Sequence, residues 1–171
     1  LAGWTILLSL LRPGGLMRVG LYSEIARRHI VAAQEMVKQG NYQPDAEGIR
    51  LFRQHLLRSP RDREPLKTAL GAADFYSTSA CRDLIFHAHE HRMTLPVIQS
   101  FLAANKLELL GLETSNDIRR DFEKRFPAER AGLDLSNWHS FEQDNPDAFQ
   151  TMYNFWIRKP QADRPGNTEA A

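Results

Sequence analysis

The chain of 171 residues lacks most features of a secreted or membrane protein. Its single cysteine, Cys81, cannot form an internal disulfide, so nothing indicates an oxidising compartment, and we expect a cytoplasmic protein. The longest apolar stretch, WTILLSLL at 4–11, is far shorter than the roughly 20 residues that span a bilayer. No basic segment precedes it and no small-residue cleavage site follows it before Arg12, so we expect neither a signal peptide nor a membrane partner.

An excess of charge of one sign is also missing. The formal net charge is +1, and the basic residues never form a dense block. Because phosphate recognition requires clustered cations, nucleic acid is not an expected partner. We expect the basic residues on solvated helix faces; they include Arg27, Arg28, Arg61, Arg63, Arg119, Arg120, Arg158 and Lys159.

Sequence periodicity predicts an α/β sheet made by the two ends of the chain. Residues 1–11 have the pattern of the last turns of a helix, and the RPGG that follows stops it, because proline breaks a helix and glycine permits a tight turn. Thr94 can cap a second helix, with Pro96 tolerated in its first turn. A third amphipathic helix is predicted through Phe122 and Phe126. The predicted strands are LMRVGLYS, LELLGLE and MYNFWIRKP, at 16–23, 107–113 and 152–160.

The segment between the first strand and Thr94 is predicted to be mostly helical. Apolar and small residues recur at helical spacing over 24–39, where Gly40 supplies the stop, and again over about 45–57. A shorter helix follows, and Ser77 or Ser79 can cap another.

These elements predict an α/β fold with a helical insertion, 25–93, after its first strand. Only three strands are predicted within 1–160, and the sequence starts at Leu1 rather than at methionine. We therefore expect the other half of the sheet to lie upstream of Leu1. The tail 161–171 has little apolar content and is predicted to be disordered.

The stretch DLIFHAHEHRMTL places three histidines and a glutamate close together. On a strand, His87, His89 and His91 would share one face, whereas on a helix His87 and His91 would be neighbours and His89 would point away. A closed zinc site needs further ligands, and only His139 lies downstream. We therefore predict no metal site, and we keep open whether these histidines are structural or line a substrate pocket as acid/base groups.

The stretch LLSLLRPGGLMRVGLYSE resembles the end of a class I S-adenosylmethionine-dependent methyltransferase domain. In that family a helix leads through L(K/R)PGG into the fifth strand of a seven-stranded sheet. MTLPVIQSFLAANKLELLGLE is similar to the next helix and sixth strand, although Asn105, Lys106 and Leu107 replace the usual Gly-Phe pair. MYNFWIRKP is similar to the seventh, antiparallel strand. RVGLYSEIAR and DFYS…CRDLIFH…EHRMTL also resemble a bacterial subgroup joined to tetratricopeptide repeats.

The resemblance implies a Rossmann-like methyltransferase sheet, of which this chain holds the last three strands. It also implies an enzyme that uses S-adenosylmethionine, bound by a glycine-rich loop and an acidic residue of earlier strands. Neither element is recognisable here, because the only glycine pair, Gly14 and Gly15, already forms the turn. We therefore predict no cofactor-binding residues in this chain and expect it to be inactive by itself.

The part of the active site that we expect in this chain is the part that binds the methyl acceptor, whose identity is unknown. The first strand ends at the edge of the sheet where ligands bind, which is the edge formed by the carboxyl ends of the strands. We expect the insertion to cover that edge as a lid. The predicted substrate-binding residues are Tyr22, Ser23, Glu24 and Tyr76, and the candidates for acid/base or orienting roles are His87, Glu90 and His91.

Two other hypotheses stay open. One is a catalytically silent methyltransferase-like module that interacts beside helical repeats, and the other is a metal-dependent hydrolase built on HAHEH. A cluster of aromatic residues is interpreted as core rather than as a surface for stacking bases. Its members are Trp138, Phe141, Phe149, Tyr153, Phe155 and Trp156.

Overall fold

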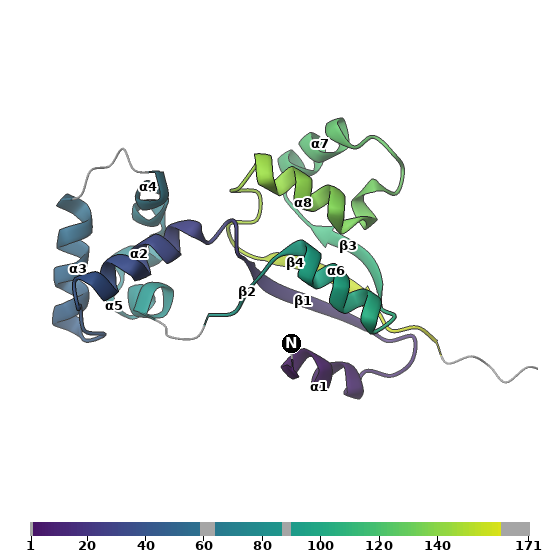
Figure 1. Cartoon of the computed structure of the whole chain (residues 1–171), viewed down its shortest axis with the longest axis horizontal. Coiled ribbons are helices and arrows are strands. Elements are labelled where there is room, and N and C mark those ends of the chain that lie inside the picture. Colours follow the sequence, from purple (N-terminus) through teal and green to yellow (C-terminus); the bar gives the residue numbers. More distant parts are fainter. Residues whose placement is uncertain (1, 59–63, 87–89, 162–171) are drawn as a thin grey trace, which may run out of the picture. The chain divides into compact units, whose positions relative to one another are not determined.

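The computed structural model describes residues 2–58, 64–86 and 90–161. The chain forms two compact units, one made of residues 1–23 with 93–171 and the other of residues 24–92. Figure 1 shows their helices and strands. The predicted disordered tail, apart from Gln161, and the histidines His87 and His89 lie outside the described residues.

The first unit is an α/β sheet with its helices. The strands follow the order β2-β1-β4-β3, and β4 is antiparallel to both β1 and β3. Strands β1 and β3 therefore run in the same direction. Its elements are α1 (Ala2–Leu10), β1 (Leu16–Ser23), α6 (Leu95–Ala104), β3 (Glu108–Glu113), α7 (Asn116–Arg125), the 3₁₀ helix Ala131–Leu133, α8 (Leu135–Asp144) and β4 (Tyr153–Arg158). The two-residue strand β2 (Arg92–Met93) lies at the boundary, with Arg92 the last residue of the second unit and Met93 in the first. The α/β class and the three longer strands agree with the sequence prediction, whereas the two-residue β2 was not predicted.

One face of the sheet carries the core. Val19 and Leu112 both pair with Phe155 across the strands, so these three side chains point to the same side, and all are buried. Trp4 of α1 stacks on Phe101 of α6 with ring centroids 4.2 Å apart, and its ring also meets Phe155 edge-on. Helices α1 and α6 therefore cover this face together.

The RPGG turn has the conformation that its residues predict. Gly14 has a φ of 73°, in the left-handed region that favours glycine. A Cβ on Gly15 would lie 2.8 Å from the Arg12 carbonyl oxygen, so this position also requires glycine. The ammonium of Lys159, just after β4, donates to the carbonyls of Leu8 and Leu11 and so caps the end of α1.

The opposite face of the sheet is polar and partly exposed. Arg18 donates two hydrogen bonds to the Glu113 carboxylate, at 2.9 and 2.6 Å, and the Trp156 indole donates a third at 2.7 Å. Trp156 is 39% exposed, so the prediction that it belongs to the core is wrong; the strand alternation that buries Phe155 turns Trp156 the other way. The remaining members of the predicted aromatic core are buried.

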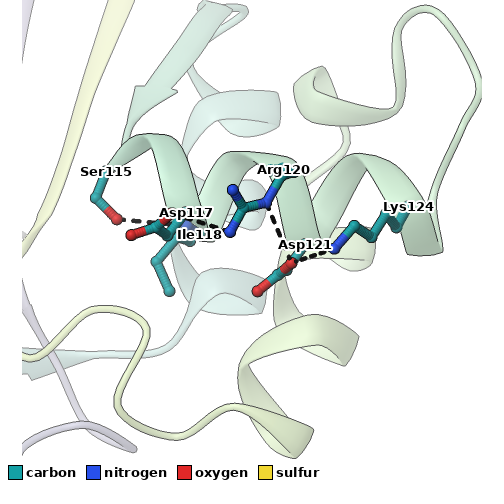
Figure 2. Close-up of polar contacts among 6 residues, drawn as sticks. All are labelled: Ser115, Asp117, Ile118, Arg120, Asp121 and Lys124. Carbon is teal, nitrogen blue, oxygen red and sulfur yellow. Dashed lines mark hydrogen bonds and ion pairs between the residues drawn. The ribbon is translucent and has the colours of Figure 1, made fainter.

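Helices α7 and α8 follow β3 and share an aromatic core. The rings of Phe122 and Trp138 stack with centroids 3.6 Å apart. Figure 2 shows the outer side of α7, where Ser115 caps the first turn and ion pairs join Asp117 to Arg120 and Asp121 to Lys124. These pairs are exposed to solvent, so each contributes little to stability. Helix α8 was missed by the sequence prediction.

The second unit is built of helices around its own core. Its elements are α2 (Arg28–Gln39), α3 (Ala46–Arg58), α4 (Glu64–Gly71), the 3₁₀ helix Ala73–Tyr76, α5 (Thr78–Cys81) and the π-helical turn Arg82–Phe86. The core cluster is Ala33, Ile49, Phe52, Leu56, Phe75, Cys81 and Ile85. Ser77 caps α5, as one of the two predicted alternatives.

One expectation for this unit is corrected by the structure. Arg27 is only 7% exposed rather than solvated, because its guanidinium binds the Glu90 carboxylate. Gly40 ends α2 as predicted, but with a right-handed φ of −84°, and the left-handed residue is the next one, Asn41, at 51°. Asparagine tolerates that conformation better than most residues.

Candidate functional site

Strands β1 and β3 end at the same edge of the sheet because they run in the same direction. β1 ends at Ser23, β3 ends at Glu113, and β4 begins between them at Tyr153. In open α/β sheets ligands bind beyond the carboxyl ends of such strands. This edge is therefore the candidate functional site of the first unit.

A buried carboxyl group lies at this edge. Glu142 of α8 is fully buried and accepts a short hydrogen bond from the Ser23 hydroxyl. The Tyr153 hydroxyl donates to the other carboxyl oxygen of Glu142 at 2.6 Å. Ser23 and Tyr153 are buried as well. Through these contacts Glu142 connects α8 to the end of β1 and the start of β4.

The surroundings of Glu142 shift its protonation. Burial raises the pKa of this carboxyl, while the hydrogen bonds from Ser23 and Tyr153 and the charge of His139 act in the opposite direction. His139 lies three residues before Glu142 on α8, and its Nδ1 is buried without a hydrogen-bond partner within the described residues. A carboxyl group of this kind can hold or exchange a proton, or fix the edge by accepting two hydrogen bonds.

A cavity of about 380 Å³ opens at the same edge. It is bordered by the end of β3 and the first turn of α7, and by the segment 147–154 that leads into β4. Its volume is within the range of small-molecule pockets, roughly 300–1,000 Å³. Hydroxyl and amide groups line it, from Thr114, Ser115, Gln150, Thr151 and Asn154. Apolar side chains, among them Ile118 and Met152, line it as well, so the cavity suits a small molecule with both polar and apolar groups.

The residues predicted to bind substrate lie in both units. In the first unit, Tyr22 is half-buried on β1 and Ser23 is buried against Glu142. Glu24, the first residue of the second unit, is exposed. Tyr76 belongs to the second unit, is 63% exposed and donates its hydroxyl to the Leu70 carbonyl.

The predicted acid/base candidates belong to the histidine stretch. His91 is exposed, and the Glu90 carboxylate is bound by Arg27, with Arg92 at 3.8 Å. His87 lies outside the described residues. Across the described part of the chain, no group of three or more histidine, cysteine, aspartate or glutamate side chains could hold a metal ion.

Glu142 and Tyr153 were not predicted as site residues. A signal for Glu142 was present, because Leu135, Trp138 and Glu142 lie on one helical face that begins after an Asp134 cap. A glutamate on an otherwise apolar helical face is a candidate site residue, since glutamate is rarely fully buried without partners. Without a predicted helix at 135–144, this signal could not be used.

None of the helices in the described residues is both long and apolar enough to cross a membrane. The chain matches no protein-family model, and no curated protein matches it either.

Proposed function

We propose that this chain is the C-terminal portion of a class I S-adenosylmethionine-dependent methyltransferase. The observation that carries the proposal is the way the two ends of the chain meet. The Gly14 amide donates to the Lys159 carbonyl at 3.0 Å, and the Lys159 amide donates back to the Gly15 carbonyl at 3.0 Å. The RPGG turn and the Lys-Pro segment that carry the resemblance are thus hydrogen-bonded to each other.

The order of strands supports the same proposal. A helix and the RPGG turn lead into β1, a capped helix precedes β3, and the last strand is antiparallel to both. The resemblance predicted these three steps, including an antiparallel final strand. Sheet topology alone is compatible with other α/β proteins, so the proposal also depends on the local motifs.

We propose that the residues that hold the cofactor lie outside this chain. A glycine-rich loop that cradles it would need glycines free to approach the ligand, but Gly14 and Gly15 are used by the turn. We propose that residues upstream of Leu1 bind the cofactor.

The proposed contribution of this chain is the acceptor side. The cavity beside β3 would hold the acceptor, whose identity is unknown, and Glu142 would fix the adjoining strand ends through Ser23 and Tyr153. Alignment of the acceptor with the methyl donor is the main requirement of such a transfer, and this demands a rigid edge.

Calorimetric titration with S-adenosylmethionine tests the proposal. The 171-residue chain should show no micromolar binding, whereas a chain extended upstream of Leu1 should bind the cofactor. Micromolar binding by the shorter chain would overturn the proposal that the cofactor binds only to residues upstream of Leu1. If the extended chain fails to bind as well, the methyltransferase proposal is wrong.

A second comparison separates an enzyme from a catalytically silent module. The extended chain is incubated with labelled cofactor and a cell extract, and transfer of the labelled methyl group is followed. Thr151→Val, which removes a hydroxyl lining the cavity, should reduce transfer, while Ser9→Ala on α1, outside the cavity, should not. Cofactor binding without transfer to any acceptor would favour the silent module.

A further inference from the structure

The helical second unit contains a cavity of its own, of about 360 Å³. It lies among α2, the turn after it and the π-helical segment, and all its lining residues belong to this unit. Its volume is again within the range of small-molecule pockets, roughly 300–1,000 Å³. Nothing in the methyltransferase proposal uses this cavity.

One wall of the cavity is apolar. Val37 and Tyr42 face it from α2 and the following turn, and Ile85 and Phe86 from the π-helical segment. The Tyr42 hydroxyl forms a 2.6 Å hydrogen bond with Nδ1 of His55, and the Tyr42 ring meets Phe52 edge-on. These contacts fix the tyrosine ring, so the wall is a preformed apolar surface.

The polar side of the cavity carries an excess of positive charge. Glu90 lines the cavity, but its carboxylate is bound through two hydrogen bonds by Arg27, which compensates its charge. Arg92 and Lys38 also line the cavity. Within the described part of this unit, the Lys38 ammonium forms no ion pair.

Arg92 presents donors that its protein contacts do not use. Its Nη1 donates to the Gln34 side chain at 3.4 Å and is 3.8 Å from the nearest Glu90 oxygen. No hydrogen bond from its Nε or Nη2 is formed with the described residues. Only 27% of the Arg92 side chain is exposed, so its guanidinium is partly desolvated. A planar guanidinium with free donors is suited to a carboxylate.

We propose that this cavity binds a small organic carboxylate with an apolar body. The carboxylate pairs with Arg92 and Lys38, and the apolar body packs against Val37, Tyr42 and Phe86. The proposal is independent of the methyltransferase proposal, because binding requires neither the cofactor nor the first unit's cavity.

The test uses 4-phenylbutyrate as the probe with the full 171-residue chain. Binding is followed by heteronuclear NMR titration, with 4-phenylbutanol as the neutral analogue and inorganic phosphate as the anion without an apolar body. Phenylbutyrate should shift resonances of Tyr42, Phe86 and Arg92, and it should bind at least about tenfold more tightly than either comparison compound, the value of one charge-assisted hydrogen bond.

Two variants and a control decide the assignment. Lys38→Gln and Arg92→Gln should each weaken phenylbutyrate binding by about tenfold. Arg50→Gln makes the same charge change on α3, away from the cavity, where Arg50 pairs with Glu47, and it should leave binding unchanged. Lys38 is exposed, so its replacement keeps the test decisive even if Arg92→Gln disturbs folding.

Three results would overturn the proposal. Phenylbutanol or phosphate could bind as tightly as phenylbutyrate, the shifts could be confined to the first unit, or Lys38→Gln could bind as tightly as the unmodified chain.

Discussion

The guanidinium of Arg27 binds the carboxylate of Glu90 and thereby joins the two ends of the helical unit. The Nε donates at 3.1 Å, and a second, shorter contact runs from Nη2. Both side chains are nearly buried, at 9% and 8% exposure. Because the unit spans residues 24–92, this pair lies where its chain enters and leaves.

Breaking this pair should destabilise the second unit. Arg27→Met leaves the Glu90 carboxylate buried without its main partner, and we expect the free energy of unfolding to fall by about 3–5 kcal/mol. The combined variant Arg27→Met, Glu90→Leu should recover part of this loss, since no buried charge remains. Urea denaturation followed by circular dichroism measures both. Arg50→Met, which breaks an exposed pair with Glu47, is the control and should change stability by less than about 1 kcal/mol. A similar small loss for Arg27→Met would contradict the assigned role.

Glu142 should make the stability of the first unit depend on pH. Its pKa is raised by burial, so the folded state binds a proton more tightly than the unfolded state, whose glutamate pKa is near 4.5. Its contribution is therefore greatest below 4.5 and declines as the pH rises through the raised pKa. Glu142→Gln keeps groups that can bond Ser23 and Tyr153 but cannot ionise.

The measurement is the free energy of unfolding of both proteins from pH 4 to 8. The variant should gain stability relative to the unmodified chain as the pH rises, and a constant difference would show that Glu142 stays in one protonation state.

Glu113 should titrate far below an ordinary glutamate. Hydrogen bonds from Arg18 and then Trp156 hold its pKa at about 2, against a usual 4.5. The stabilisation from this carboxylate is present above 4.5 and is lost as the pH falls through about 2. Arg18→Gln should return the pKa most of the way to 4.5, and Trp156→Phe should return it less far. NMR titration of the Glu113 side-chain carboxyl carbon measures each pKa. An unchanged Glu113 pKa in Arg18→Gln would show that Arg18 is not the cause of the lowered value.

Cys81 should be unreactive in the folded protein. The thiol is buried in the core of the second unit, and desolvation raises its pKa, against a smaller opposite effect of Arg53. A thiol reagent such as Ellman's reagent should label the native chain only at the rate of local or global unfolding. The urea-denatured chain should react at once. Rapid labelling without denaturant would show that this core opens readily.

Several features were predictable because neighbouring residues determine them. The RPGG turn follows from the consecutive residues Pro13, Gly14 and Gly15, and β4 follows from the alternation of Tyr153, Phe155 and Ile157. The core-facing side of α3 follows in the same way from helical spacing. In each case the pattern and the structure it specifies occupy the same short segment.

The candidate site was only partly predictable. The sequence places Ser23 at this edge, because it ends the first strand, but its partner Glu142 is 119 positions away and lies on the helix that was missed. Trp156 was assigned to the core from its aromatic character, although strand alternation could have placed it on the outer face.

The sequence by itself determined the α/β class, the main strands and the turn that joins α1 to β1, since these depend on local backbone preferences and apolar periodicity. Tertiary structure decided which charges are buried. Arg27 binds Glu90, which is 63 positions away, and Ser23 binds Glu142 only after the chain has folded. These polar groups can be buried because each has a hydrogen-bonding partner from a distant part of the chain, and the type of residue alone does not predict this.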